Sequence, residues 1–364
     1  MKFGLFCIMA SPHGDHRREM RELLEQAELA EELGYDSIWL AEHHSAYGIM
    51  GNPAVTLAAI AQRTSRIRLG TAIAVLPFQN PLRIAEDYAM VDVLSNGRLD
   101  FGAGRGSQWL EYQLMRADRD HSKEVFWEAL DIILALWNTP GKISYHGQHF
   151  QFDEIETFPK PVQKPIPVWV AAVSPDTFPK CAERGLQVMT AGVGEWEEFR
   201  ERTLGAATVL VEKGFAPEAL EFPHSLLTHI GPSNEEARAR FVGPMWNMHL
   251  LTPFSPFGSV PAAVKDFEHY KKMNEGLLKH GTGESLFDEA RAKRHTMVSD
   301  SATARDFLRQ LRDEVGVNHY IAAMNVGGLD HKLVVESMRR FAEEVIPEFR
   351  DTHTSPALVA SRPA

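Results

Sequence analysis

A helix stop, a buried strand and a polar cluster follow one another in Gly34-Tyr35-Asp36-Ser37-Ile38-Trp39-Leu40-Ala41-Glu42-His43-His44. Gly34 favours the end of a helix, because the left-handed position after a helix C-terminus suits glycine. The apolar run 37–41 is typical of a strand that is buried on both faces. A helix is expected before this stretch, and Pro53 begins another helix after it, since proline is favoured in the first helical turn. The stretch therefore predicts alternating helices and strands, with polar side chains where a strand ends.

The same alternation extends in both directions along the chain. Strands are expected at 2–8, 37–41, 67–76, 98–103, 168–173, 187–190, 225–230 and 319–324, and helices at 17–33, 53–64, 81–94, 122–137, 176–184, from 234, 302–315 and 332–349. Eight strands interleaved with helices predict an α/β protein built as a single closed (β/α)8 TIM barrel with insertions. An open doubly wound sheet is the alternative, because it too buries its strands on both faces.

One domain is expected over residues 1–350, because no Pro/Gly-rich linker and no internal repeat divides the chain. An inserted hairpin is expected at 143–152, where a His-Gly turn separates two alternating runs. The weakly patterned polar stretch 252–298 is interpreted as a mobile lid over the barrel mouth, with a disordered surface insertion as the alternative. The Ser-, Ala- and Pro-rich tail at 351–364 is expected to fray.

Composition argues against several classes of protein. The 364 residues carry a formal charge of −11, with 38 basic against 49 acidic side chains, which disfavours binding to nucleic acid. The two cysteines, Cys7 and Cys181, form no CxxC motif, so neither a disulfide framework nor a structural zinc site is expected. The N-terminal apolar run is too short for a signal peptide, and no window approaches the length of a membrane span. A soluble cytoplasmic protein is the expectation.

Glu42-His43-His44 directly follows the second expected strand. A carboxylate and two imidazoles at a strand end can transfer protons near neutral pH, and strand ends are where parallel α/β barrels carry their functional residues. A polar rim without function is the alternative. A metal site is not expected, because successive residues of an extended chain face opposite sides and His43 and His44 cannot easily bind one ion.

Gly102-Ala103-Gly104-Arg105-Gly106-Ser107 follows the fourth expected strand. The run resembles a dinucleotide-binding fingerprint, but its third glycine comes one position too early. Glycines let the backbone approach a ligand closely, and an arginine side chain makes bidentate bonds to phosphate. The run is therefore interpreted as a flat surface with one phosphate-binding guanidinium, with a plain glycine-rich turn as the alternative.

Polar or aromatic side chains also mark other strand ends and the late part of the chain. Ser174 and Thr177 stand at the start of a helix, where hydroxyls and free N–H groups can bind an anion or simply cap the helix. Asn325 offers a donor and an acceptor to the edge of a heterocycle, and a turn is its alternative role. Trp246 and its apolar neighbours could line a substrate pocket or belong to the core.

These motifs occur together in one order, which is far more specific than any one of them. The order runs through Met1-Lys2-Phe3-Gly4, Gly34 to His44, Gly51-Asn52-Pro53, Leu69-Gly70-Thr71-Ala72, Val75-Leu76-Pro77, Gly97-Arg98 and Phe101 to Gly106. In this order nearly the whole chain resembles the bacterial-luciferase-like flavin-dependent monooxygenases, and within them the luciferase α-subunit pattern. The resemblance implies a luciferase-like (β/α)8 barrel that binds reduced FMN at its C-terminal rim.

The resemblance also implies a two-component enzyme. A separate flavin reductase would supply FMNH2, which reacts with O2 to a flavin C4a-hydroperoxide that oxygenates a small, mostly apolar organic substrate. His43 falls on the catalytic histidine of the family, and Glu42 falls beside the flavin. His44 and Trp246 are expected to line the substrate pocket.

The cofactor-binding set implied by the resemblance combines a phosphate clamp with residues along the flavin. Arg105, Ser174 and Thr177 fall on phosphate-binding positions, and a non-proline cis peptide of the family maps to Ala72-Ile73. The full set is Ala72, Ile73, Gly104, Arg105, Ser107, Val173, Ser174, Thr177 and Asn325. His44 and Glu86 fall on positions that meet across the luciferase dimer, so a homodimer is expected.

The chain departs from the luciferase pattern around the flavin. The reactive-cysteine position is Gly104, and two glutamate positions are Val173 and Asn325; further departures lie at Ala191-Gly192 and Ser299-Asp300-Ser301. These changes favour a monooxygenase that acts on another substrate over a light-emitting enzyme. Two alternatives stay open: a deazaflavin-dependent hydride-transfer oxidoreductase, which the same barrel can host, and a non-catalytic flavin-binding partner subunit.

Overall fold

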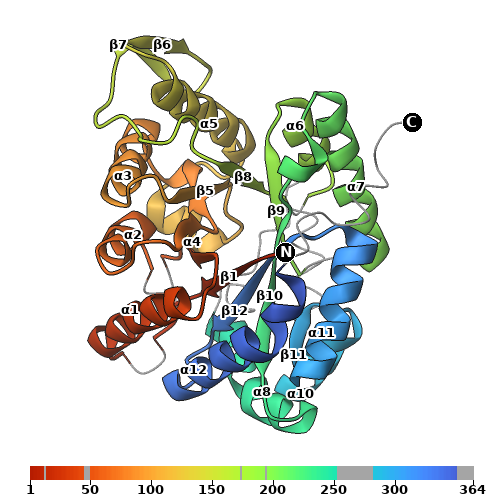
Figure 1. Ribbon diagram of the computed structural model, residues 1–364. Helices are drawn as coiled ribbons and strands as arrows, with labels where there is room; N and C mark the ends of the chain where they lie inside the picture. The colour runs from red at the N-terminus through yellow and green to blue at the C-terminus, as the bar shows by residue number, and fades with distance from the viewer. Residues whose placement is uncertain (12–13, 45–49, 173, 193–194, 252–281, 351–364) are drawn as a thin grey trace.

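Parallel strands close into a ring in the computed structural model, which describes residues 1–11, 14–44, 50–172, 174–192, 195–251 and 282–350 (Figure 1). The ring runs β10-β12-β1-β2-β3-β5-β8-β9 and closes where β9 pairs with β10. Its strands are β1 Lys2–Cys7, β2 Ser37–Leu40, β3 Arg68–Thr71, β5 Leu99–Gly104, β8 Val168–Ala171, β9 Gln187–Ala191, β10 Pro223–Ile230 and β12 His319–Asn325. The predicted eight-stranded TIM barrel is confirmed, because an open sheet would leave two edges unpaired.

Further strands join this ring or stand apart from it. β4, Ala74–Val75, pairs with β5 beyond the end of β3. β11, Thr296–Ser299, pairs with the carboxyl half of β10. The expected hairpin is present as antiparallel β6, Ile143–His146, and β7, Gln151–Ile155. It projects beside α5 at the periphery of the molecule (Figure 1).

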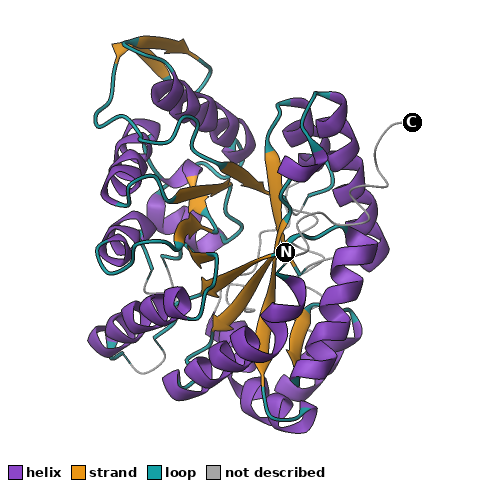
Figure 2. Cartoon of the chain, viewed as in Figure 1, coloured by secondary structure: helices purple, strands orange, loops and turns teal. Residues whose placement is uncertain are grey.

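Helices surround the ring of strands (Figure 2). Apolar side chains of helices and strands share one core cluster. They are α1 His16–Glu32, α2 Pro53–Ala61, α3 Pro81–Leu94, α4 Trp109–Met115, α5 Ser122–Asn138, α6 Thr177–Glu183, α7 Trp196–Glu212, α8 Asn234–Leu251, α10 Gly283–Ala292, α11 Ser301–Gln310 and α12 His331–Arg340. A wider turn, Leu311–Val315, extends α11, and Phe341–Val345 and Ile346–Phe349 extend α12. Asn52 and Asn80 cap α2 and α3, each directly ahead of a proline in the first helical turn, as expected for Pro53.

Trp39 of β2 fills the interior of the barrel. Its ring meets that of Trp169 on β8 edge-on, with ring centroids 5.8 Å apart. Gly70 of β3 makes room for it, since a Cβ on Gly70 would lie 2.2 Å from Cε3 of Trp39. A second apolar layer lies between strands and helices, where Phe3 packs on Phe341 at 5.6 Å. The core thus has an inner part and an outer part, as a barrel requires.

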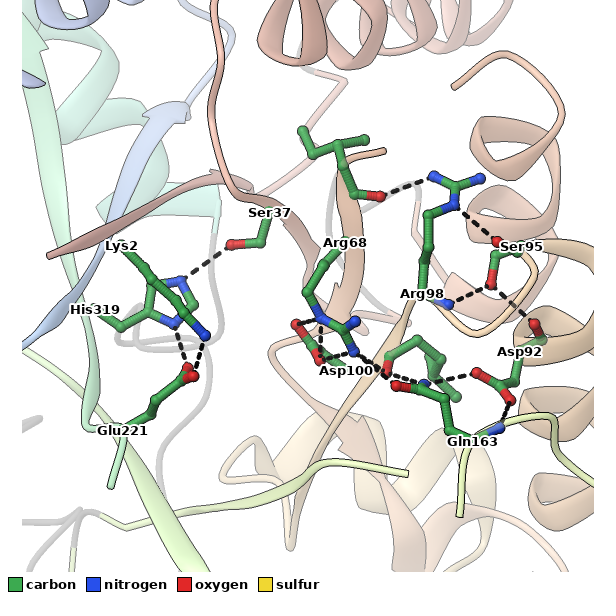
Figure 3. A network of polar contacts seen from close by, with 12 residues as sticks. Lys2, Ser37, Arg68, Asp92, Ser95, Arg98, Asp100, Gln163, Glu221 and His319 are labelled. Carbon is green, nitrogen blue, oxygen red and sulfur yellow. Dashed lines mark hydrogen bonds and ion pairs between the residues drawn. The ribbon is translucent and has the colours of Figure 1, made fainter. Parts of the chain in front are cut away.

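A polar network closes the amino-terminal end of the barrel (Figure 3). Arg68 donates to both carboxylate oxygens of Asp100, at 2.8 and 2.9 Å, and His319 bridges Ser37 and Glu221. Burial works against ionisation of Glu221, but the hydrogen bond and charge of His319, together with Lys2, lower its pKa to about 2. A network at the amino-terminal end of a barrel stabilises the fold. The functional residues are therefore expected at the carboxyl-terminal end of the strands.

The polar stretch 252–298 contains regular structure that its pattern does not indicate. From residue 282 it forms α10 and then β11, where only Leu286 and Phe287 of the helix are buried. Two buried side chains among many charged ones give no clear helical periodicity. Residues 252–281 lie outside the described residues, so the lid stays a prediction there, and the tail 351–364 lies outside them too. Among the described helices, none combines the length and the apolarity needed to span a bilayer.

Candidate active site

The carboxyl ends of the strands lie together at the other end of the barrel, where barrel enzymes carry their functional residues. Strands β2, β3, β5 and β8 are consecutive in the ring, and β4 continues beside β5. Glu42-His43-His44 therefore follows a strand that neighbours the one leading to Ala72-Ile73. The loops after β5 and β8, which begin with Arg105 and Ala172, are neighbours in the same way.

Glu42 is a buried carboxylate that holds two parts of the surrounding chain. Its Oε2 accepts a hydrogen bond from the backbone N–H of Val75 at 2.9 Å, and its Oε1 lies 2.8 Å from Nε2 of His44. The hydrogen bond with Glu42 raises the pKa of His44; burial opposes this, and the charges of Glu42 and Glu111 reinforce it. The hydrogen bonds of Glu42 to His44 and to Val75 together fix the loop after β2 against β4.

His43 is the more accessible of the two histidines, with 27% of its side chain exposed. Its Nδ1 lies 3.2 Å from Oε1 of Glu111 and 3.3 Å from Nε2 of Gln108. Both partners belong to the start of α4, and the side chain of Glu111 is 1% exposed. His43 can therefore meet a bound molecule on one ring edge while buried groups hold the other.

Gln108 and Glu111 belong to no motif that the sequence pattern indicates. They stand more than sixty residues from His43 in the chain, at positions 108 and 111. Their spacing could have indicated a site, because residues three apart on a helix share a face. The helix that carries them, α4, follows the carboxyl end of β5, where barrel enzymes carry functional residues. The closed ring is what brings that face to the loop after β2.

The expected non-proline cis peptide is present between Ala72 and Ile73. The side chain of Ile73 lies across Gly104 of β5. A Cβ on Gly104 would stand 2.0 Å from Cδ1 of Ile73 and 3.3 Å from Cβ of Ala171. Ile73, Gly104 and Ala171 thus meet at neighbouring strand ends, and this apolar contact is called the ledge below. The ledge offers apolar and backbone atoms to a flat aromatic ring, and Gly104 is required because the side chain of Ile73 already occupies the space that a Cβ would need.

The residues expected to bind phosphate lie on the two neighbouring loops. Arg105 and Ser107 are half-buried after β5, and the backbone oxygen of Arg105 accepts a hydrogen bond from the Tyr112 hydroxyl. Ser174 and Thr177 are half-buried after β8, where the N–H of Thr177 donates to the backbone oxygen of Ser174 at 3.0 Å. One guanidinium and two hydroxyls on adjacent loops can bind a phosphate. Val173 lies outside the described residues.

Asn325 is not brought to this cluster. Its Nδ2 donates to Oε1 of Gln26 on α1 at 2.8 Å. The pairing of β1 with β12 slips between Phe6 and Cys7, so that Phe6 faces Ala323 and Cys7 faces Asn325. A bulge of this kind changes the face on which the next side chain lies, which alternation along the strand does not reveal.

The two residues expected in the substrate pocket have different surroundings. The ring of His44 stands edge-on to Phe78 at 5.7 Å, next to the His43 cluster. Trp246 lies on α8, and its Cβ is 3.0 Å from where a Cβ on Gly283 of α10 would stand. Trp246 is therefore packed at least partly between helices. In the described part of the chain, no group of three or more His, Cys, Asp or Glu side chains could hold a metal ion.

Comparisons with known proteins identify the family of the chain. The chain is 27% identical to the oxygenase component of a flavin-dependent trigonelline monooxygenase from Acinetobacter baylyi, over 97% of this chain and 96% of that protein. It is 30% identical to an alkanal monooxygenase alpha chain from Photorhabdus luminescens, over 96% and 98%. The crystal structure of monooxygenase RslO1 from Streptomyces bottropensis superposes with a TM-score of 0.80 at 25% identity, covering 96% of this chain and all of that one. The model of the luciferase-like monooxygenase family matches residues 1–327, and the chain belongs to that family.

Proposed function

We propose that the protein is the oxygenase component of a two-component monooxygenase that uses FMNH2 and O2 to oxygenate a small, mostly apolar organic substrate. The observation that carries the proposal is His43, partly exposed at the carboxyl end of β2 and held from behind by buried Glu111. A positioned imidazole of this kind transfers protons near neutral pH. The similarity to an oxygenase component supports the two-component part, in which a separate reductase supplies FMNH2.

The residues present fit FMN. The ledge of Ile73 across Gly104, where a Cβ would collide with Ile73, suits the isoalloxazine ring of FMN. Arg105, Ser174 and Thr177 suit the phosphate of FMN. When bound, the reduced flavin would supply the activation of O2, by the C4a-hydroperoxide route that the resemblance implies. All other tasks fall to the side chains of the protein.

Those tasks divide among His43, the pair Glu42 and His44, and apolar side chains of the site. His43 exchanges a proton with the reacting groups through its accessible ring edge. Glu42 and His44 hold the loop that carries His43, and Glu42 fixes the backbone of β4 at Val75. The cis peptide before β4 therefore keeps its position relative to the imidazole ring of His43. Apolar side chains around Ile73 and Phe78 keep water from the reacting atoms.

A homodimer is part of the proposal. α2 and α3 pack against each other, and they expose four large apolar side chains, Val55, Met90, Val93 and Leu94. Exposed apolar groups on adjacent helices are typical of a protein interface. The resemblance places Glu86, which lies on α3, at the dimer contact.

An anaerobic titration followed by turnover tests the proposal. Full-length protein is titrated with FMNH2 and, separately, with a reduced deazaflavin, and is then given O2, a flavin reductase and a panel of apolar substrates. Saturable FMNH2 binding with substrate-dependent oxygenated product supports the proposal. Binding of the deazaflavin alone, with hydride transfer, would replace it by the oxidoreductase alternative. FMNH2 binding without product across the panel would favour a non-catalytic partner subunit.

A further inference from the structure

Glu111 touches both the ring and the backbone of the histidine pair. Its Oε1 accepts a hydrogen bond from the backbone N–H of His44 at 2.9 Å and lies 3.2 Å from Nδ1 of His43. One oxygen atom is thus tied to the main chain that carries His43 and to the ring of His43 itself. The Glu111 side chain is 1% exposed, so water does not compete for this oxygen.

The contact with Glu111 decides which nitrogen of His43 carries the proton. An ionised carboxylate has no hydrogen to donate, so a bond to Nδ1 requires that Nδ1 carry its own hydrogen. With the opposite tautomer, a lone pair on Nδ1 would face a negative oxygen. Nε2 of Gln108, 3.3 Å from the same atom, could donate to that lone pair. A charged acceptor outweighs a neutral donor at a similar distance, so the tautomer with hydrogen on Nδ1 is favoured.

The other ring nitrogen then has a free lone pair. Within the described residues, no hydrogen bond of the structure reaches Nε2 of His43, and the ring is partly exposed. We propose that Glu111 is a positioning residue: it holds neutral His43 with its proton on Nδ1 and so makes Nε2 the atom that accepts a proton in the site. The catalytic meaning of this inference rests on the proposed function, whereas the tautomer itself does not.

The helix that carries Glu111 is anchored independently by the next residue. The hydroxyl of Tyr112 donates to the backbone oxygen of Arg105, and its ring packs edge-on against Phe78 at 4.9 Å. Glu111 and Tyr112 therefore hold different halves of the site, the histidine and the loop after β5. This division provides a matched control, because Tyr112→Phe removes a contact of α4 without touching His43.

Nitrogen NMR of the flavin-free, full-length protein tests the inference directly. The protein is labelled with ¹⁵N in its histidine rings, and the signals of His43 are assigned by their loss in His43→Ala. We expect hydrogen on Nδ1 of neutral His43 in the wild type and in Tyr112→Phe. Hydrogen on Nε2 in the wild type overturns the inference, with no need for any Glu111 variant to fold.

Two substitutions at Glu111 then separate positioning from general structure. Glu111→Ala removes the acceptor, so we expect the Nδ1 preference to be lost and kcat to fall about 10- to 100-fold, with KM and FMNH2 affinity little changed. Glu111→Gln keeps an oxygen for both N–H groups, so we expect it to restore the tautomer and most of kcat. An unchanged tautomer in Glu111→Ala contradicts the inference. If the wild type shows the expected tautomer but does not bind FMNH2, the proposed function is rejected and the inference about Glu111 stands.

Discussion

The side chain of Ile73 lies directly across the backbone of Gly104, so that a Cβ on the glycine would stand 2.0 Å from Cδ1 of the isoleucine. Ile73 directly precedes β4, whose Val75 faces Gly104 of β5. This contact brings the cis peptide Ala72-Ile73 to the end of the strand that leads into the Arg105 loop. The proposed ring site and the proposed phosphate site thus share one strand.

Gly104→Ala is expected to displace Ile73 and weaken FMNH2 binding. The added methyl overpacks the ledge, which costs about 1–3 kcal/mol of unfolding free energy. Urea unfolding and anaerobic flavin titration measure the two effects. Gly205→Ala on α7 is the control, since a Cβ there meets no atom within 4 Å. Equal stability and equal affinity in Gly104→Ala and wild type would show that the ledge is not where the flavin binds.

His43→Ala is expected to lower product formation by about 100- to 10,000-fold, the usual contribution of a positioned acid–base group. FMNH2 affinity should survive, because the proposed phosphate site and the ledge are untouched. Coupled O2 uptake and product analysis provide the measurement. His121→Ala, which removes an exposed histidine paired with Asp118, is the matched control. Retained turnover in His43→Ala would remove His43 from the catalytic role.

Arg105→Ala is expected to weaken FMN binding by about 10- to 150-fold, because a hydrogen bond to a charged group contributes about 1.5–3 kcal/mol. Riboflavin, which has no phosphate, should bind both forms equally. Fluorescence titration with the two ligands separates loss of a phosphate contact from general damage to the site. Arg202→Ala on α7 serves as the control for loss of a positive charge. A parallel loss of riboflavin affinity would speak against a phosphate contact.

Val55→Glu is expected to convert the proposed homodimer to a monomer. The Val55 side chain is 66% exposed, so a charge there leaves the fold of one chain intact but cannot be buried against a second copy. Light scattering coupled to gel filtration gives the mass. Ala239→Glu, on an exposed position of α8, introduces the same charge elsewhere. A wild-type protein that elutes as a monomer would contradict the prediction on its own.

Acid is expected to destabilise the barrel through Glu221. Its pKa of about 2 lies below the ordinary 4.5, so the carboxylate stabilises the folded state above pH 4.5, and this contribution is lost as the pH falls toward 2. The full contribution is on the order of 3 kcal/mol. Urea unfolding of the wild type and Glu221→Gln at several pH values measures it. Their difference should be constant near neutral pH and shrink below about pH 4.5; a difference independent of pH would exclude this origin.

Much of the fold follows from local chemistry. Gly34 and Pro53 mark helix ends in the sequence, and the structure has α1 and α2 on the expected sides of them. The strands were predictable because a strand buried on both faces is an unbroken apolar run. α10 was not predictable, because its charged side chains conceal the few residues that pack. β11 was not, because it is only four residues long and two of them are polar. The contact of Asn325 with Gln26 was not predictable, because a bulge interrupts the alternation along the strand.

The sequence by itself determined the order of strands and helices, and with it which residues stand at strand ends. These properties depend only on residues that are close in the chain. They are sufficient to predict Glu42, His43 and Arg105 as site residues at strand ends. Only the tertiary structure decided which strand ends meet and what lies behind each side chain. The contact of Glu111 with His43 exists because the ring closes and carries α4 to the loop after β2. A hydrogen bond across such a distance in the chain depends on packing, which no local pattern encodes.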